Sequence, residues 1–294
     1  MSRSHPALDR VIGVLACPVC GGSMTAGGTA VVCVDGHSVD IARQGYVSLT
    51  GGRSTAGDTT AMIEARERFL GVGHYDPIGD AVAAMIPDGL TGVCVDVGGG
   101  TGHHLARVLE SRPGLDGLVL DTSKPALRRA ARAHSRIAAA AADAWGALPL
   151  RTGSVAVVLS IFAPRNPAET VRVLAPGGAF VVVTPTERHL AELVAAVGLV
   201  RVDERKEERL AHRLAAFELE RTASVEYTVA LGRRDAVDDV LMGPSGHHAD
   251  AERIELELAG LPDPVSATVS VTVSLFRVRG GGTDALAAEG DRRG

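Results

Sequence analysis

The chain has 294 residues, a net charge of −5 at pH 7 and a pI of about 6.1. Hydrophobic residues make up 46% of it, enough for a large core, yet no uninterrupted apolar run of about 18 residues occurs, so no membrane span is expected. The acidic balance argues mildly against a nucleic-acid partner, because phosphate contacts favour basic faces. Nearly all of the 30 basic residues are arginines, which suit phosphate contacts, so charge alone does not decide the partner.

The first fifty residues hold three of the four cysteines. The spacing Cys17-x2-Cys20-x12-Cys33-x3-His37 places four sulfur and nitrogen donors in two close pairs. Zinc binds such donors in a tetrahedron, and a closed set of four leaves no position for water, so we predict a structural zinc site. The ion would stabilise a module too small to form its own core. Asp35 is the alternative to His37 as the fourth ligand.

The remaining cysteine, Cys94, lies in an apolar strand pattern. This cysteine usage indicates one metal site in a reducing cytoplasm rather than a disulfide scaffold. The apolar run before the first cysteine has Asp9 and Arg10 beside it and leads directly into the cluster, so we do not expect a signal peptide.

The predicted elements follow in chain order. Short strands are expected at 30–34 and 45–49, a linker at 50–60, and a helix within 61–78 that stops at its glycines. Strands are then expected at 92–97, 116–121, 154–162 and 178–185, alternating with helices at 103–112, 124–134, 166–174 and 187–198. This alternation predicts a parallel sheet covered by helices on both faces. Past residue 200 we expect an exposed helix running into a strand at 203–218, strands at 224–231 and 266–278, and a disordered tail.

The stretch "VDVGGGTG" (95–102) lies between a predicted buried strand and a predicted helix. Its glycines, Gly98, Gly100 and Gly102, let the backbone turn sharply and approach a ligand at the helix N-terminus. The dinucleotide fingerprint would need glycine or alanine at His103, so NAD is disfavoured. The acidic residue Asp96 followed by alternating glycines resembles motif I of class I S-adenosylmethionine methyltransferases.

Two downstream aspartates agree with that resemblance. Asp121 ends the second strand of the series and can accept hydrogen bonds from both ribose hydroxyls of the cofactor. Asp143 lies where such enzymes bind the adenine amino group. We therefore predict an α/β chain with a class I (Rossmann-like) methyltransferase domain and a small N-terminal zinc ribbon.

The stretches "CPVCGGSM", "GDTTAMIEARERFLGVGHYDPI", "VDVGGGTG", "SIFAPRN" and "TPTERHLAEL" occur in this order. Together they resemble the RlmA/TlrB-type 23S rRNA (guanine-N1)-methyltransferases over residues 15–278. The resemblance implies methylation of N1 of a guanosine in a 23S rRNA hairpin loop, beside the macrolide-binding part of the exit tunnel. It also implies a homodimer whose zinc modules help to form an RNA cleft, in the cytoplasm that the cysteine usage indicates. One subgroup confers resistance to tylosin-like and mycinamicin-like macrolides.

The resemblance also implies roles for single residues. It places the zinc ligands on the three cysteines and the histidine named above, and further cofactor contacts on Tyr75, Thr101, Gly102 and His189. Housekeeping relatives carry a basic residue in place of Ser160 and tyrosine in place of Phe162. The "SIFAP" stretch of this chain therefore fits the resistance-type branch of the family better than the housekeeping branch.

Guanine N1 becomes nucleophilic only as its proton leaves, so the protein must align donor and acceptor and assist proton loss. The base must also leave any stack to enter the pocket. We expect the flipped guanine to lie against residues 160–164, where Phe162 and Pro164 would contact it. Asp58 is a candidate proton acceptor, although it could equally be a turn residue.

The corresponding domain prediction has four parts: a zinc-binding RNA-recognition module at 1–50, a linker and helix with the "GHY" segment at 51–78, the methyltransferase domain at 79–280, and the tail at 281–294. Two other functions stay open on the sequence. One is methylation of a small molecule such as a quinone or a macrolide sugar. The other is a non-catalytic zinc-ribbon adaptor.

Overall fold

The computed structural model describes residues 5–52, 57–197, 214–243, 246 and 251–279. Most of the helix expected at 203–218 and the tail from residue 280 lie outside the described residues, as does part of the linker expected at 50–60. Within the described ranges no helix is long and apolar enough to cross a membrane.

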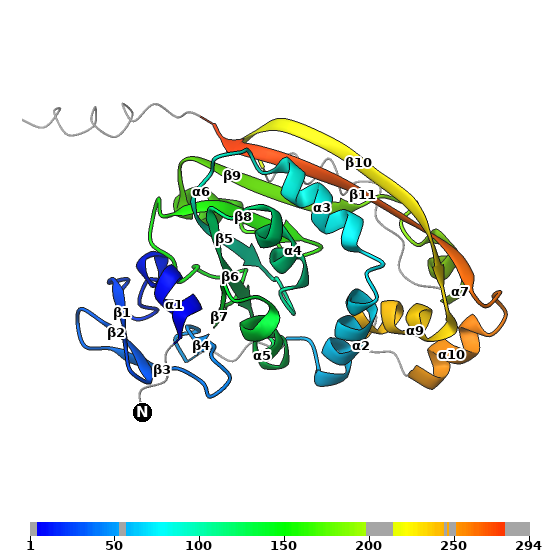
Figure 1. Ribbon diagram of the computed structural model, residues 1–294, viewed down its shortest axis with the longest axis horizontal. Helices are drawn as coiled ribbons and strands as arrows, with labels where there is room; N and C mark the ends of the chain where they lie inside the picture. The colour runs from blue at the N-terminus through cyan, green and yellow to red at the C-terminus, as the bar shows by residue number, and fades with distance from the viewer. Residues whose placement is uncertain (1–4, 53–56, 198–213, 244–245, 247–250, 280–294) are drawn as a thin grey trace, which may run out of the picture.

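The centre of the molecule is an eight-stranded sheet in the order β10-β11-β9-β8-β5-β6-β7-β4 (Figure 1). Its strands are β4 (Val47–Ser48), β5 (Gly92–Val97), β6 (Leu115–Asp121), β7 (Ile137–Ala141), β8 (Val155–Ile161), β9 (Leu174–Pro185), β10 (Phe217–Leu231) and β11 (Val265–Val278). The six strands from β9 to β4 are parallel, and the long β10–β11 hairpin continues the sheet antiparallel to β9. The chain runs outward through β5, β6 and β7, then returns to β8 on the other side of β5. Ligands of open α/β sheets bind beyond the carboxyl ends of the strands at such a switch point.

The strands carry apolar residues on both faces, which divides the core into two layers. Along β5, Val93 and Val95 lie in one core cluster and Cys94 lies in the other, as the two-residue period of a strand requires. The helices are α2 (Thr60–Gly71), α3 (Asp76–Met85), α4 (His103–Ser111), α5 (Lys124–Ala133), α6 (Pro167–Val173), α7 (Ala191–Val197), α9 (Arg233–Met242) and α10 (Ala251–Leu258). Residues of α3, α4 and α5 pack in the Cys94 layer, whereas α6 belongs to the opposite layer.

The N-terminal module packs against that opposite face of the sheet. It consists of the helix α1 (Pro6–Val11) and an antiparallel sheet of β1 (Met24–Gly27), β2 (Ala30–Cys33) and β3 (Ser38–Asp40). Leu8 and Val11 of α1 share a hydrophobic cluster with Val95 of β5. The module also extends the large sheet, since β4 pairs with β7 in parallel. The zinc ribbon and the large sheet therefore share one apolar layer.

The alternating strands and helices agree with the sequence predictions, with several differences. The helices α1 and α3 and the short strands β1 and β3 were not expected as separate elements. The strand β7 was missed, because its sequence "IAAAA" has low strand propensity and only its burial inside the sheet makes it a strand. The helices α9 and α10 were not anticipated. The expected helix at 187–198 begins only at Ala191, and β10 begins at Phe217 rather than at residue 224.

Candidate active site

The structure brings the four predicted zinc donors together in the N-terminal module. One ligand atom each from Cys17, Cys20, Cys33 and His37 lies within 4.8 Å of the others. The Sγ atoms of Cys20 and Cys33 are 3.7 Å apart, and His37 Nδ1 lies 3.3 Å from Cys33 Sγ. A tetrahedral zinc ion with Zn–S bonds of about 2.3 Å holds its sulfur ligands about 3.8 Å apart. The donor set fits zinc, with His37 rather than Asp35 in the cluster.

Two tight turns create this arrangement. Gly21 and Gly36 have φ values of 74° and 83°, in the left-handed region that side chains disfavour. In the first turn the backbone N–H of Cys17 donates to the Gly22 carbonyl at 2.8 Å. In the second turn the Gly36 N–H donates to the Cys33 carbonyl at 3.0 Å. Each turn therefore folds one pair of donors back on itself.

The glycine loop follows β5 at the switch point of the large sheet. Gly98, Gly100 and Gly102 all have positive φ, at 74°, 56° and 79°. A Cβ atom at Gly98 would lie 2.8 Å from the Cβ of Ala163, so the loop directly contacts the segment after β8. Thr101 is buried in the same loop, and α4 begins immediately after it. The loop thus leads directly into a helix N-terminus, as a cofactor-binding loop requires.

Two carboxylates, the buried Asp96 and the half-buried Asp121, adjoin the loop. Asp121 Oδ2 accepts a hydrogen bond of 2.9 Å from the Gly100 N–H, and its Oδ1 accepts one of 2.8 Å from the Ser123 N–H. Burial raises the pKa of Asp121 despite these bonds. Asp96 Oδ1 is buried without a hydrogen-bond partner among the described residues. Burial, and to a lesser extent the charge of Asp121, raises the pKa of Asp96 to about 7.

Unsatisfied buried polar atoms are rare in folded proteins and indicate a missing ligand or a functional role. The N–H groups of Gly98, Gly99 and Gly102 donate to backbone carbonyls and that of Gly100 donates to Asp121, so they hold the loop in shape. The N-terminus of α4 and the unpartnered Asp96 oxygen together fit a cofactor with several hydrogen-bonding groups. They occupy the place where the sequence predicts S-adenosylmethionine.

Asp58 lies at the edge of this loop and forms an ion pair with Arg66 of α2, with Oδ2 and Nη1 2.6 Å apart. The Asp58 carbonyl accepts a hydrogen bond of 2.8 Å from Ser123 Oγ. A Cβ atom at Gly100 would lie 3.1 Å from Arg66 Nη1, so the guanidinium also borders the glycine loop. No sequence pattern distinguished Arg66 from the other arginines, and only the packing of α2 places it here.

A second group of site residues surrounds Tyr75, which is buried. Its hydroxyl lies 3.0 Å from Asp239 Oδ1 and 3.3 Å from His189 Nε2. Ser270 N–H donates to His189 Nδ1 at 3.2 Å, which leaves the hydrogen of the neutral ring on Nε2. Nε2–H can therefore donate to the Tyr75 hydroxyl, which in turn donates to Asp239. Burial lowers the pKa of His189 to about 4, so the ring is neutral at pH 7.

Tyr75 and His189 belong to sequence motifs of the family, whereas no motif of the sequence points to Asp239. This residue belongs to α9, and its burial follows from the packing of α9 against α2. Two other acidic residues of α9 contact the chain around Tyr75. Asp235 Oδ2 lies 3.0 Å from His74 Nε2, and Asp238 forms an ion pair of 2.6 Å with Arg68 of α2. In sequence these acids resemble an ordinary solvated helix face.

Phe162 follows β8 and stacks on His189, with ring centroids 5.6 Å apart and an interplanar angle of 26°. Its φ of 52° is uncommon for a bulky side chain and costs about 1–3 kcal/mol. The ring is 41% exposed, although an apolar side chain of this size is usually buried. Strained residues of this kind cluster at functional sites, which suits the predicted contact with a target base.

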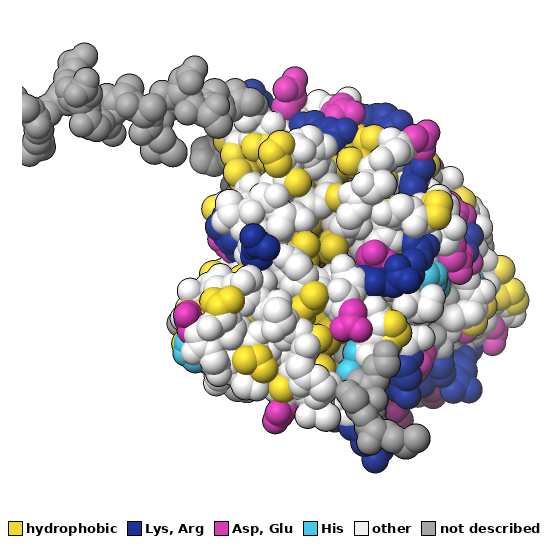
Figure 2. All heavy atoms as spheres, turned by 60° about the vertical axis from the view of Figure 1, so that its left-hand side comes forward, with side chains coloured by type: hydrophobic (Ala, Val, Ile, Leu, Met, Phe, Trp, Pro, Cys, Tyr) yellow, Lys and Arg dark blue, Asp and Glu magenta, His cyan; other side chains and the backbone are white. Residues whose placement is uncertain are grey.

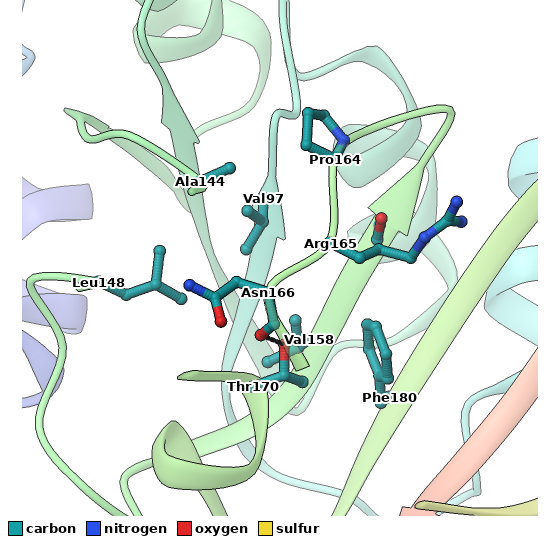
Figure 3. Close-up of a pocket in the computed structure, with 10 residues that line it drawn as sticks. Val97, Ala144, Leu148, Val158, Pro164, Arg165, Asn166, Thr170 and Phe180 are labelled. Carbon is teal, nitrogen blue, oxygen red and sulfur yellow. Dashed lines mark hydrogen bonds between the residues drawn. The ribbon is translucent and has the colours of Figure 1, made fainter. Parts of the chain in front are cut away.

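Pro164 belongs to the same segment and lines a small pocket beneath it (Figure 3). The pocket is mostly apolar, with Val97, Ala144, Leu148, Val158 and Phe180 among its lining residues. Asp143 precedes Ala144 in the loop after β7, where its Oδ1 accepts a hydrogen bond of 2.9 Å from the Trp145 N–H. All predicted cofactor and target-base residues thus follow carboxyl ends of strands or border the loops there. Their individual roles stay predictions.

The sheet order, the glycine loop after β5 and the acidic residue that ends β6 define a class I methyltransferase fold with an N-terminal zinc ribbon. A family model described as "RlmA, N-terminal", a zinc ribbon, matches residues 15–50. The chain is 46% identical, over 91% of its length and 98% of the relative's, to the 23S rRNA (guanine(748)-N(1))-methyltransferase of Streptomyces fradiae. It belongs to the family of 23S rRNA (guanine-N1)-methyltransferases.

Two further similarities were found. A protein of Micromonospora griseorubida, provisionally assigned the 23S rRNA (guanine-N1)-methyltransferase activity, is 47% identical over 90% of this chain and 97% of its own length. A S-adenosylmethionine-dependent methyltransferase from Thiobacillus denitrificans, solved with S-adenosyl-L-homocysteine, superposes with a TM-score of 0.48 and 15% identity. That comparison covers 72% of this chain and 97% of the solved chain.

Proposed function

We propose that this protein transfers a methyl group from S-adenosylmethionine to N1 of a guanosine in a 23S rRNA hairpin loop. The observation that carries the proposal is the 46% identity, over nearly the whole chain, with a relative named for guanine 748. The guanine at that position is the proposed target. The buried acids and the glycine loop supply the cofactor site that this reaction needs.

In this proposal the glycine loop, the N-terminus of α4, Asp96 and Asp121 bind the cofactor, and Asp143 binds its adenine. Tyr75, Thr101 and His189 complete the contacts. When bound, S-adenosylmethionine supplies a methyl group already activated by its sulfonium centre. The protein's part is to hold the guanine in line with that methyl group and to accept the N1 proton.

Phe162 offers the target base an aromatic face beside the cofactor loop, because the adjoining Ala163 contacts Gly98. The N1 proton leaves as the bond from N1 to the methyl carbon forms, and S-adenosylhomocysteine departs. Asp58 is the proposed acceptor of that proton. Its ion pair with Arg66 orients the carboxylate beside the loop.

The finer parts of the proposal follow from the family. We infer a cytoplasmic homodimer in which the zinc ribbons of two copies help to bind the hairpin, and a role in macrolide resistance. The proposed domain boundaries are residues 1–50, 51–78, 79–280 and 281–294. Figure 2 shows basic side chains along the upper edge and the right-hand side of this face, interspersed with acidic ones.

The test is primer extension on rRNA from cells that express the chain, compared with cells that do not. A methyl group on N1 blocks base pairing, so reverse transcription should stop next to one guanosine of the hairpin. Macrolide tolerance of the same cells tests the resistance role. If rRNA stays unmarked while a small molecule is methylated, or if no methyl transfer occurs at all, the proposal is wrong and one of the two alternative functions holds.

The proposed base is tested separately by Asp58→Asn in single-turnover reactions. The amide keeps the shape of the side chain but cannot accept a proton, so methyl transfer should slow by about 100-fold or more. Binding of S-adenosylhomocysteine, measured by calorimetry, serves as the control for an intact loop. An unchanged single-turnover rate would remove Asp58 from the mechanism.

A further inference from the structure

Trp145 is the single tryptophan of the chain, and 63% of it is exposed. Aromatic residues make up only 3% of the sequence, and all of them lie within the described residues. Apart from Trp145 and Phe162 they are buried or half-buried. Burying a tryptophan is among the largest apolar gains in folding, so an exposed one in so aromatic-poor a chain requires a reason.

The backbone around Trp145 is held in place by its neighbours. Its N–H donates to Asp143 Oδ1 at 2.9 Å, and the Gly146 N–H donates to the Asp143 carbonyl at 3.1 Å. The side-chain amide of Asn166 donates to the carbonyls of Trp145 and Gly146 at 3.3 and 3.1 Å. The indole is therefore presented to solvent by an ordered turn, which lowers the entropy cost of binding a ligand.

The same contacts connect Trp145 to the candidate active site. Asn166 ends the segment 162–166 that carries Phe162, and the Ala163 of that segment contacts Gly98 of the cofactor loop. Ala144, Pro164 and Asn166 surround one pocket at this edge of the sheet (Figure 3). The two exposed aromatic rings of the protein thus lie in two loops that are tied together beside the cofactor loop.

From this arrangement we infer that Trp145 is a stacking site for an unpaired RNA base that flanks the target guanosine. The inference rests on the proposed function, since it takes the substrate to be a single-stranded loop of rRNA. Aromatic faces bind unpaired bases in this way with little dependence on sequence, and an exposed indole on an ordered turn is suited to it. A base that stacks on Trp145 would hold the hairpin loop open while the guanosine occupies the site at Phe162.

Two other ligands would also fit an exposed indole. The adenine of the cofactor could stack on it, because the adjoining Asp143 is the proposed adenine ligand. A protein surface, including a second copy of the chain, could also cover it. We favour RNA because the turn holding Trp145 is tied to the segment of the target base, and each rival gives a different result in the experiment below.

Because Trp145 is the only tryptophan, the fluorescence of the full-length wild-type protein reports this site directly. The probes are a 23S rRNA hairpin containing the target guanosine, the same strand paired into a full duplex, and S-adenosylhomocysteine alone. The hairpin should quench the tryptophan emission, and the duplex and S-adenosylhomocysteine should not. Emission that responds to S-adenosylhomocysteine alone, or to protein concentration without RNA, overturns the inference in favour of the corresponding rival.

Substitution gives a second, independent measurement. Trp145→Ala should weaken hairpin binding by about fivefold to 150-fold in a labelled-RNA assay, the range for loss of one stacked base, and should leave the affinity for S-adenosylhomocysteine unchanged. Trp145→Phe should recover part of the loss. Leu256→Ala, at a side chain that is 76% exposed on α10, is the matched control and should have no effect.

The two proposals fail in distinguishable ways. If the wild-type chain methylates the rRNA while hairpin binding leaves Trp145 emission and the Trp145→Ala affinity unchanged, only the stacking site is wrong. If the wild-type chain neither binds nor methylates the hairpin, both proposals are wrong.

Discussion

The hydroxyl of Tyr75 donates a buried hydrogen bond of 3.0 Å to Oδ1 of Asp239, a residue 164 positions away in the sequence. The bond joins the "GHY" segment to α9. The same hydroxyl lies within hydrogen-bond distance of His189. A helix without any recognisable motif therefore sets the position of two predicted cofactor contacts.

Tyr75→Phe should lower the stability by about 1–3 kcal/mol and weaken cofactor binding. The substitution leaves a buried Asp239 oxygen and the His189 Nε2–H without their partner. Calorimetric titration with S-adenosylhomocysteine and chemical unfolding measure the two effects. Tyr46→Phe, at another buried tyrosine, is the control and should leave the cofactor affinity unchanged. Equal affinities for wild type and Tyr75→Phe would contradict the assignment of Tyr75 as a cofactor contact.

Asp239 should make the stability depend on pH. Burial raises its pKa to about 7, above the value of about 3.9 for an unfolded aspartate, although the bond from Tyr75 lowers it. Between these values the folded state keeps a proton that the unfolded state releases, so the free energy of unfolding falls as pH rises from about 4 to 7. The full contribution is about 4 kcal/mol.

Asp239→Asn cannot ionise and keeps an oxygen for the Tyr75 hydroxyl. It should match the wild type near pH 4 and exceed it at pH 8 by up to about 4 kcal/mol in urea unfolding. The neighbouring Asp238→Asn breaks an ion pair with Arg68 instead, so it should be less stable than wild type at pH 8. A Asp239→Asn variant with the wild-type pH profile would show that Asp239 is already ionised in the folded protein.

Gly98→Ala should abolish cofactor binding. The added Cβ would lie 2.8 Å from the Cβ of Ala163 and would force apart the cofactor loop and the segment of Phe162. Gly153→Ala is the matched control, because Gly153 also has a positive φ, at 63°, with open space around it. In both variants the alanine must adopt a positive φ, which costs about 1–2 kcal/mol. The two variants therefore differ only in the steric clash with Ala163, which Gly98→Ala has and Gly153→Ala lacks. Normal affinity for S-adenosylhomocysteine in Gly98→Ala would contradict the contact.

Purified protein should contain one zinc ion per chain, measured by elemental analysis, and Cys33→Ser should lose it. Because Cys33 belongs to the same apolar layer as Val93 and Val95 of β5, loss of zinc should lower the thermal stability of the whole chain. Cys94→Ala, a change in the large sheet, should retain the ion. Zinc-free wild-type protein of unchanged stability would refute the zinc site.

The alternating elements and the two ligand motifs were predictable from the sequence. A glycine loop between an apolar strand and a helix, and four metal donors at short spacings, are local patterns whose geometry follows from a few neighbouring residues. The strand β7 was not predictable, since alanine is depleted in strands. Its pairing with β6 and β4 and the packing of α5 and α1 against its two faces make it a buried strand. The pairing of the β10–β11 hairpin with β9 likewise depends on contacts between distant segments.

The sequence by itself determined the zinc ligands, the cofactor loop and the family, because each depends on residue types at fixed spacings. The tertiary structure alone decided that Asp239 and Arg66 border the site and that Trp145 is exposed at its edge. These relationships arise when helices and loops far apart in the chain pack at one end of a sheet. Charged helix residues and a lone tryptophan carry no local pattern from which such packing could be inferred.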